Sequence, residues 1–552
     1  MKSITAHPES IRRIFTRKYI IPIFQRPYSW EQEQCEKLWT DIIEFLDNKD
    51  DKDDKYFLGN IVVHPSSDGE LDTLEVIDGQ QRLTTLLLLI KAIHSRCNGL
   101  LDAGALEACL KTKDPITDKL TSNLRVDSHV LAEDKKNLHF LILQGVDKTP
   151  KCKFVENYRL LETVIDEWCK SIDGGDDGLV VALNEFIPML LNDIVLIPIH
   201  CESQNDALTI FETINNRGLS LSDADIFKAK LYQHTTQTRQ ATFIEEWNAL
   251  KNHDWLFRVL MHIIRAESGS CEKEISLRSF FTTKETPLSK PDEIMNSLNL
   301  INRIEEENWF DSDEIASLWY IMNAYPNHYW KFPLYVFLHK HGSIDPKTNE
   351  FALPGKMGTQ FRELLEATVK YFFIKGLLHN RVTAMKQTVY CVCAKIESSG
   401  DYISEYRKDL KDANIDLINF EGKQQQRYIG GLVLLSAYLN PTQNKADFRE
   451  VIRGKYHIEH ILPKKWNHYD GWDEDTYGVH LDTLGNCIPL SSSLNIAAKN
   501  EFFDRKKVEY KKSTIQDALD LLHIAEWTPK EVEKKHAEKV TRLKDFFNSV
   551  WA

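Results

Sequence analysis

The stretch between residues 456 and 499 constrains the chain more than any other, because it gathers side chains suited to phosphodiester chemistry. It opens with Tyr-His-Ile-Glu-His-Ile-Leu-Pro, which places Glu459 beside His460, and it later carries Asn486 and Asn495. His460 can take a proton from water, since its side chain ionises nearest neutral pH. Glu459 offers a hard oxygen ligand for Mg²⁺ or Mn²⁺, and Asn495 offers a neutral one. Asn486 could hold the imidazole in one tautomer. The pattern favours metal-assisted phosphodiester cleavage.

The same stretch predicts a β-hairpin followed by a helix. Ile458–Leu462 is expected to form the first strand and Asn486–Leu490 the returning strand. Asn495 then falls early in a helix that continues through Lys499 and Phe502–Lys507.

This order and spacing resemble the HNH, or His-Me finger, nucleases, in which a hairpin carries the acidic–histidine pair and a following helix carries the last ligand. The resemblance implies that His460 is the general base and that Asn486 orients it. It also implies that Glu459 and Asn495 hold a single divalent cation. His457 is left open, either as a support residue or as a metal ligand in place of Glu459.

Basic side chains follow the hairpin, and they predict contacts with DNA phosphates. They are Lys499, Arg505, Lys506, Lys507, Lys511 and Lys512. Two further histidines, His468 and His480, lie in the loop between the strands, and both are expected to be solvated surface residues.

Length and composition bound the remaining possibilities. The chain has 552 residues, which predicts two or three domains, and its net charge of −13 argues against a generally basic nucleic-acid coat. Local basic patches and a metal can still serve a DNA enzyme. Ten cysteines without a CxxC pair favour reduced thiols and make a zinc site unexpected. With no long apolar run and no signal-like start, we expect a cytoplasmic protein without a membrane partner.

A second motif lies near the N-terminus, where Asp-Gly-Gln-Gln-Arg at residues 78–82 joins a predicted strand to a predicted helix. Leu74–Ile77 is the strand, with another expected at Tyr56–His64, and Leu83–Ile93 is the helix. A glycine turn at a helix N-terminus is a natural anion site, because free N–H groups and the helix dipole point outward. Arg82 adds a planar fork suited to phosphate. Taken alone, the motif is equally compatible with an ordinary tight turn.

The segment before this motif is polar and extended. Gln25 and Arg26 are followed by Pro27, and Ser29 with Gln32 is expected to cap a helix that runs through residue 46.

A third polar segment follows the predicted strand Asp193–His200. A short helix is expected at residues 207–214, and it ends in a turn that contains Asn215 and Arg217. Lys228 lies in the next predicted helix. Turns rich in Asn, Arg and Gly beside a strand suit contacts with phosphate or another polar ligand.

Together these segments resemble the N-terminal domain of the GmrSD-type, modification-dependent (type IV) restriction enzymes, which is similar to the ParB/sulfiredoxin-like nucleotide-binding fold. An HNH-like segment is the second half expected of that family. In the family, the Asp-Gly-Gln-Gln-Arg motif is tied to binding and hydrolysis of a nucleoside triphosphate. The resemblance implies nucleotide contacts by Gln25, Arg26, Asp78, Gln80, Gln81, Arg82, Asn215, Arg217 and Lys228. The chain has no GxxxxGK[ST] segment to support a P-loop.

The remaining regions predict helices. An insert at about residues 98–190 is expected to be helix-rich, and residues 236–430 carry apolar stripes at helical spacing. An aromatic stretch is expected to be core, with a base-stacking pocket as the alternative. Its members are Trp319, Tyr320, Tyr325, Tyr329 and Trp330.

The sequence therefore predicts a multidomain α+β protein. Residues 1–235 would form a ParB-like α/β domain, residues 236–430 a helical region, and residues 431–552 a ββα-metal nuclease domain. The resemblance implies an NTP-regulated endonuclease of antiphage defence that cuts double-stranded, modified DNA. Two copies of the chain are expected to pair as a homodimer. Two alternatives remain: a nuclease triggered by another cue, and a ParB-like NTP-switch protein that binds DNA without cutting it.

Overall fold

The computed structural model describes residues 5–49, 51, 53–66, 72–97, 100–203, 206–207, 210, 223–282, 287–306, 309–310, 312–379, 381–420, 426–465 and 467–549. The chain forms two compact units. Unit 1 comprises Met1–Trp247 with Leu288–Pro291, and unit 2 comprises Asn248–Pro287 with Asp292–Ala552. The three-part division at residues 235 and 430 stays a prediction. No helix of the described residues is long and apolar enough to cross a bilayer.

Unit 1 is built on a mixed sheet with the strand order β1-β9-β4-β5-β3-β8, and β2 also pairs with β9. The strands are β1 (Thr5–Ala6), β2 (Glu9–Ser10), β3 (Lys18–Ile21), β4 (Tyr56–Pro65), β5 (Thr73–Asp78), β8 (Val126–Ser128) and β9 (Ile194–His200). The predicted strands at 56–64, 74–77 and 193–200 are thus confirmed to within a residue. The fold is multidomain and combines helices with a mixed sheet.

Strands β3, β5 and β8 run parallel, and this direction defines two edges of the sheet. Tyr19 of β3 pairs with Leu74 of β5 and with Val126 of β8. The carboxyl ends of the three strands therefore meet at one edge, where Asp78 ends β5. The amino ends meet at the opposite edge. Ligands of parallel sheets bind preferentially beyond the carboxyl ends.

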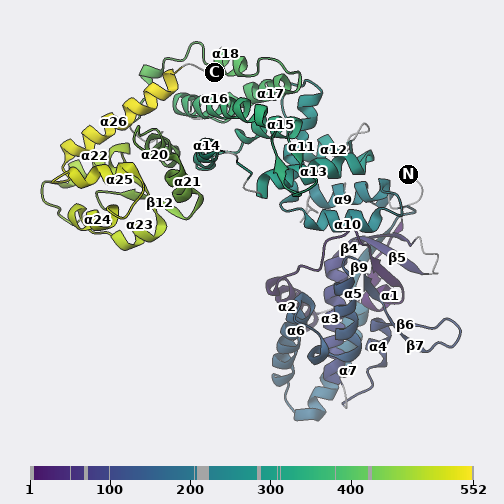
Figure 1. Cartoon of the computed structure of the whole chain (residues 1–552). Helices are drawn as coiled ribbons and strands as arrows, with labels where there is room; N and C mark the ends of the chain where they lie inside the picture. The colour runs from purple at the N-terminus through teal and green to yellow at the C-terminus, as the bar shows by residue number, and fades with distance from the viewer. Residues whose placement is uncertain are drawn as a thin grey trace. The chain divides into compact units, whose positions relative to one another are not determined.

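Helix α3 (Gln80–Cys97) is the core of unit 1, because its leucines are fully buried. Helices α2 (Gln32–Asp47) and α6 (Lys153–Lys170) pack with it into one apolar cluster (Figure 1). The predicted cap of α2 is wrong by two residues: Glu31 and Gln34 form the capping box. The other helices of unit 1 are α1 (Ile11–Ile14), α4 (Gly104–Leu110), α5 (Ala132–Gln144), α7 (Gly175–Asp193), α9 (Asp223–His234) and α10 (Gln240–Ala249).

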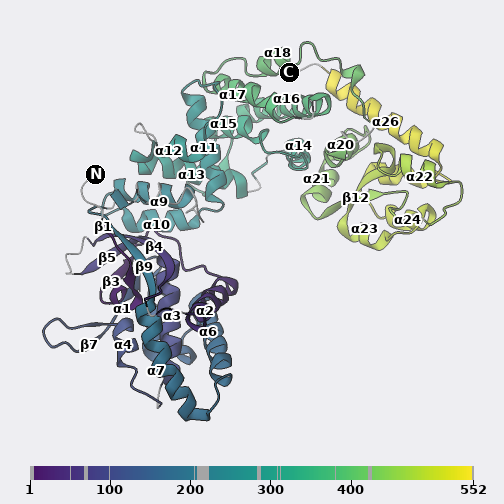
Figure 2. The same ribbon diagram turned by 180° about the vertical axis from the view of Figure 1, so that it is seen from behind.

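The insert at residues 98–190 is rich in helix, as predicted, and it also contains short strands. Between α4 and α5 the chain forms an antiparallel pair, β6 (Lys111–Lys113) and β7 (Leu120–Leu124), and then β8 joins the main sheet. The β6–β7 pair extends from the body of unit 1 as an arm (Figure 2). Short polar strands lack the continuous apolar periodicity that would reveal them in the sequence.

The first part of unit 2 is helical, as predicted. Its helices are α11 (His253–Glu267), α12 (Leu277–Thr282), α13 (Pro291–Glu306), α14 (Asp313–Asn323), α15 (Lys331–His341), α16 (Gly355–His379), α17 (Thr383–Glu397), α18 (Ile403–Asp409), α20 (Ile429–Tyr438) and α21 (Lys445–Arg453), with a small pair β10 (Ser343–Ile344) and β11 (Phe351–Ala352). Trp319 and Trp330 are both buried, and their rings pack edge to face with centroids 5.3 Å apart. Packing in the core therefore explains the aromatic stretch better than a base-stacking pocket does.

The chain then forms a hairpin of β12 (Tyr456–His460) and β13 (Cys487–Ser491). The remaining elements are α22 (Glu474–His480), the 3₁₀ turn η5 (Leu484–Asn486), α23 (Ser492–Ala498), α24 (Phe503–Tyr510), α25 (Gln516–Leu519) and α26 (Pro529–Asn548). The predicted continuous helix after the hairpin is wrong: Lys499 adopts φ +51°, and this left-handed residue separates α23 from α24.

Candidate active site and nucleotide-binding motif

The β12–β13 hairpin places the predicted catalytic residues on two faces. Glu459 pairs with Ile488 and His460 with Cys487 in an antiparallel register. Because side chains alternate along a strand, His457 and Glu459 share one face, whereas His460 points to the other. The backbone N–H of Ile461 donates to Asn486 O at 2.9 Å and closes the end of the hairpin.

The imidazole of His460 is fixed by an acidic side chain. Its Nε2 atom lies 3.0 Å from Oδ1 of Asp482, in the loop between the strands. Burial lowers the pKa of His460 below its usual 6.5, and nearby Lys464 lowers it further, while Asp482 opposes the shift. The imidazole is therefore neutral at neutral pH, as a general base must be.

Asn486 does not contact this imidazole, which corrects its predicted role. Its Oδ1 accepts from Leu462 N at 2.7 Å and from Trp527 Nε1 at 3.1 Å. Its Nδ2 donates to Leu481 O at 2.7 Å. The fully buried amide holds together the chain on both sides of the inter-strand loop. Asn486 thus shapes the segment that carries both His460 and Asp482.

His457 and Asn495 meet on the other face of the hairpin. Nδ2 of Asn495 lies 3.0 Å from Nδ1 of His457. Oδ1 of Asn495 is shielded from water and has no hydrogen-bond partner in the described part of the chain. The amide NH₂ faces Nδ1 of His457 and leaves the amide oxygen unused, and an amide oxygen and an imidazole are ligand types that a divalent cation can use. Among the described residues, no three His, Cys, Asp or Glu side chains form a metal-binding group.

Glu459 is occupied by a buried ion pair. Its Oε1 lies 2.7 Å from Lys506 Nζ and accepts from Tyr510 OH at 2.9 Å. Lys506 also donates to His460 O at 2.6 Å, and its side chain is only 1% exposed. The predicted DNA contact by Lys506 is therefore wrong, because the ammonium faces the hairpin. The geometry assigns Glu459 and Lys506 to bracing β12 against α24.

Four further basic residues and histidines were predicted to lie at the surface, and three of the four do. Lys499 and Arg505 are exposed, and Arg505 pairs with Glu501 at 3.2 Å. His468 is exposed as expected. His480 is buried, contrary to expectation, because its Nδ1 contacts Thr476 O at 2.7 Å within α22.

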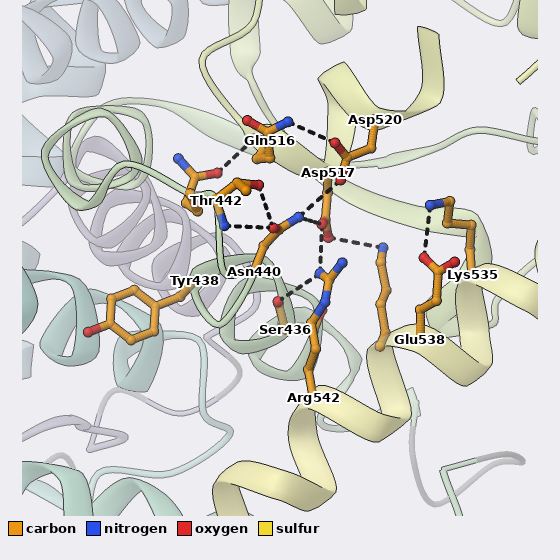
Figure 3. A network of polar contacts seen from close by, with 12 residues as sticks. Ser436, Tyr438, Asn440, Thr442, Gln516, Asp517, Asp520, Lys535, Glu538 and Arg542 are labelled. Atoms are coloured by element: carbon orange, nitrogen blue, oxygen red, sulfur yellow. Dashed lines mark hydrogen bonds and ion pairs between the residues drawn. The ribbon is translucent and has the colours of Figure 1, made fainter. Parts of the chain in front are cut away.

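Helix α26 is joined to neighbouring elements by a buried polar network (Figure 3). Asp517 accepts from Asn440 Nδ2 and from Arg542 Nη1, each at 2.8 Å. Lys539 lies 3.5 Å from the same carboxylate and donates to Cys487 O at 2.6 Å. Burial alone would raise the pKa of Asp517, but Lys539 and Arg542 outweigh it and hold the pKa low. A charged network thus ties α26 to β13.

In unit 1, the Asp-Gly-Gln-Gln-Arg motif forms a tight turn between β5 and α3. Gly79 adopts φ +91°, and an added Cβ would lie 2.4 Å from a methyl carbon of Ile61, so only glycine fits. Burial raises the pKa of Asp78, although the guanidinium groups of Arg82 and Arg26 oppose this shift. Two cations thus lie near the carboxyl end of β5, at the sheet edge where ligands are expected.

Three glutamines predicted to contact the nucleotide are buried, and the amides of two of them, Gln25 and Gln81, bond to backbone instead. Gln81 Oε1 accepts from Ser29 N at 2.8 Å, and its Nε2 donates to Pro27 O at 3.1 Å. Gln25 Nε2 donates to Ile77 O at 3.1 Å. The amide of Gln81 is therefore committed to the backbone of the 27–30 segment and positions it. Gln80 is likewise buried.

Arg82 and Lys228 differ in how they are held. Arg82 donates to Asn60 O, and Gly59 leaves room for its guanidinium because a Cβ there would lie 3.0 Å from Nη1. Lys228 is 5% exposed, and burial lowers its pKa to about 8. No hydrogen bond joins Lys228 to another described residue. Its neighbour Ala229 packs with Phe24 and Ile77, which flank Gln25 and Asp78. The predicted site residues Asn215 and Arg217 lie outside the described residues.

Sequence reasoning missed three supporting residues. Asp482 lies 22 positions from His460, and Trp527 and Lys539 lie farther along the chain from the hairpin atoms they contact. No local sequence pattern marks Trp527 or Lys539 as a partner of the hairpin. For Asp482 the signal was that an acidic residue lies in the loop between the two strands.

Comparison with known families now identifies the class. Residues 10–232 match the GmrSD restriction endonuclease, N-terminal domain, and residues 403–539 match the GmrSD restriction endonucleases, C-terminal domain. The two matches together span well over half of the chain, in the order expected. No curated protein matches the chain. The chain belongs to the GmrSD-type restriction endonuclease family. It is therefore a restriction endonuclease, a class whose partner is DNA.

Proposed function

We propose that the β12–β13 hairpin with α23 is an HNH-type nuclease site and that His460 is its general base. The observation that carries this proposal is the 3.0 Å contact between His460 Nε2 and Asp482 Oδ1. The contact leaves Nδ1 of a neutral imidazole to accept a proton from water. Asp482 orients the ring and stabilises the imidazolium that forms, as a carboxylate does in hydrolytic triads.

His457 and Asn495 are the residues that would hold a divalent cation, Mg²⁺ or Mn²⁺. The unpartnered amide oxygen of Asn495 supports this choice over Glu459, whose Oε1 is engaged by Lys506 and Tyr510. When bound, such a cation would neutralise charge on a DNA phosphate. Lys499 and Arg505 are exposed and remain the proposed phosphate contacts of this unit.

A nucleoside triphosphate is proposed to bind unit 1 at the carboxyl ends of β3 and β5, in a ParB-like site. Arg26 and Arg82 near Asp78, together with the buried ammonium of Lys228, supply cationic groups for the phosphates. Gln25 and Gln81 shape the site rather than contact the nucleotide, since both amides bond to backbone. The proposal that this nucleotide is hydrolysed rests on the family resemblance.

The biological proposal is restriction of modified foreign DNA in antiphage defence. A nucleotide-gated cut would protect host DNA from an otherwise unrestrained nuclease. Pairing of two copies would suit double-strand cleavage.

The test is cleavage of modified phage DNA and matched unmodified DNA with Mg²⁺, with and without NTP. His460→Ala is compared with His379→Ala, which removes an exposed histidine at the end of α16. We expect cutting of modified DNA by wild type and by His379→Ala, and a loss of about 10²- to 10⁴-fold in His460→Ala. Equal cutting of both DNAs would move the specificity to another trigger. Undiminished cutting by His460→Ala would remove His460 from the mechanism.

A further inference from the structure

We propose that unit 1 binds the backbone of duplex DNA in a basic cleft at the amino ends of β3, β5 and β8. This inference rests on the proposed DNA substrate and extends it, because it adds a contact surface at the sheet edge opposite the Asp-Gly-Gln-Gln-Arg motif. The cleft has a volume of about 880 Å³, and residues of the β6–β7 arm are among those that line it.

The lining of this cleft is strongly cationic for a chain of net charge −13. Four basic and two acidic side chains line it: Arg12, Lys18, Lys113, Arg125, Asp72 and Asp114. One acidic group is already satisfied, because Asp114 accepts from Ile116 N at 3.0 Å and Thr117 N at 2.8 Å in the arm's own turn. The side chains that line the cleft thus carry two more positive than negative formal charges.

Within the described part of the chain, two of these cations hydrogen-bond to neutral acceptors alone. Arg12 Nε donates to Asn192 Oδ1 at 3.1 Å. Arg125 donates to Ala108 O at 3.2 Å and to Thr16 O at 2.5 Å, and it makes no ion pair with a described residue. Arginine has five donors and cannot lose its charge, so each guanidinium keeps free N–H groups and an uncompensated charge. Thr112, Thr121 and Asn123 also line the cleft. Arginine, threonine and asparagine side chains are among the groups that contact phosphates and sugars of DNA.

The arm distinguishes a duplex from a small phosphate ligand. Its turn is ordered by the Asp114 hydrogen bonds, yet it holds Ile116 92% exposed at the tip. A nucleotide inside the cleft would leave this apolar side chain in water. A duplex lying along the cleft would reach the arm, and apolar side chains at such positions contact the minor groove. Lys113, which forms only a surface pair with Asp118 at 3.0 Å, can exchange that partner for a phosphate.

The test measures DNA binding separately from cutting. The full chain carrying His460→Ala is titrated in EDTA onto a fluorescent duplex of about 20 base pairs, between about 50 and about 200 mM salt. We add Arg12→Ala with Lys113→Ala, because neither side chain bonds to backbone. Lys37→Ala, on the exposed face of α2, is the matched control for loss of a cation from unit 1. Both modified and unmodified duplexes are used.

We expect the double variant to bind about tenfold more weakly and to lose about two from the magnitude of the salt slope, for either duplex. Lys37→Ala should match the parent, and NTP affinity should not change in any variant. Ile116→Ser should weaken DNA binding without changing the slope. Equal affinity and slope in the double variant and the parent would overturn the cleft assignment, even if the wild-type chain cuts DNA. Absence of cutting by the wild type would instead count against the nuclease proposal. The binding assay would still test the cleft, because it does not depend on cutting.

Discussion

Nε2 of His460 lies 3.0 Å from Oδ1 of Asp482, so an acidic residue of the inter-strand loop, and not Asn486, orients the proposed general base. Asn486 instead bonds to the backbone on both sides of that loop. The proposed catalytic site thus depends on two sets of contacts: the imidazole–carboxylate contact of His460 and a buried amide that fixes the loop carrying Asp482.

The first prediction concerns pH. Burial lowers the pKa of His460 below 6.5, and Asp482 raises it. The base is active when neutral, so single-turnover cleavage should rise with pH to a plateau, and the midpoint of this rise should lie below about pH 6.5. Asp482→Asn removes the charge that raises the pKa, so the acid limb should move to lower pH. The plateau rate should fall by up to about 10⁴-fold, because the ring loses the carboxylate that fixes its tautomer and orientation.

The readout is the cleavage rate between about pH 5 and about pH 8.5, beside Asp504→Asn, which changes an exposed acid on α24 as a control. An acid limb that stays in place in Asp482→Asn would show that the titrating group is not His460.

The second prediction separates the metal and support roles of Glu459. Glu459→Ala leaves Lys506 buried without its partner, which should cost about 3–5 kcal/mol in the free energy of unfolding. His457→Ala should leave thermal stability nearly unchanged and raise the Mg²⁺ concentration needed for cutting, since His457 is exposed.

Thermal melting of unit 2 and a Mg²⁺ titration of cleavage check both outcomes. Arg505→Ala is the control for stability, because its pair with Glu501 is exposed and should contribute less than about 1 kcal/mol. If Glu459→Gln raised the Mg²⁺ requirement while the melting temperature held, Glu459 would be the ligand.

The third prediction uses Lys228. Burial lowers the pKa of its ammonium to about 8, so the amine is charged below that pH and neutral above it. A polyphosphate binds the charged form, and NTP affinity should therefore fall as pH rises through about 8, by up to about tenfold per unit. Lys228→Met should weaken binding at lower pH and abolish this step. Calorimetry at several pH values measures both, and a step that persists in Lys228→Met would assign it to another group.

Local patterns predicted much of this site. Both hairpin strands were predicted within about two residues, and the strand–turn–helix of residues 74–97 followed from apolar runs around Gly79. Lys506 was predicted to contact DNA because it lies in a basic run with Arg505 and Lys507. The sequence of a short, polar helix does not show which of its sides packs against a strand, and here that side carries Lys506. The His460–Asp482 contact joins residues 22 apart and depends on a loop whose path is set by tertiary packing.

The fourth prediction tests how α26 positions the hairpin. A Cβ at Gly485 would lie 2.1 Å from Val532 O, so Gly485→Ala should push α26 away and cost about 2 kcal/mol or more. Separation would draw Lys539 from Cys487 O and loosen the turn that holds Asn486. We therefore expect a lower cleavage rate at saturating DNA with little change in DNA affinity. Gly478→Ala, in α22 with open space around its Cβ position, is the matched control and should be neutral or slightly stabilising. Lys539→Met should reproduce the rate loss while sparing backbone packing, because it removes the ammonium alone. If both variants cut at the wild-type rate, α26 would serve stability without positioning the active site.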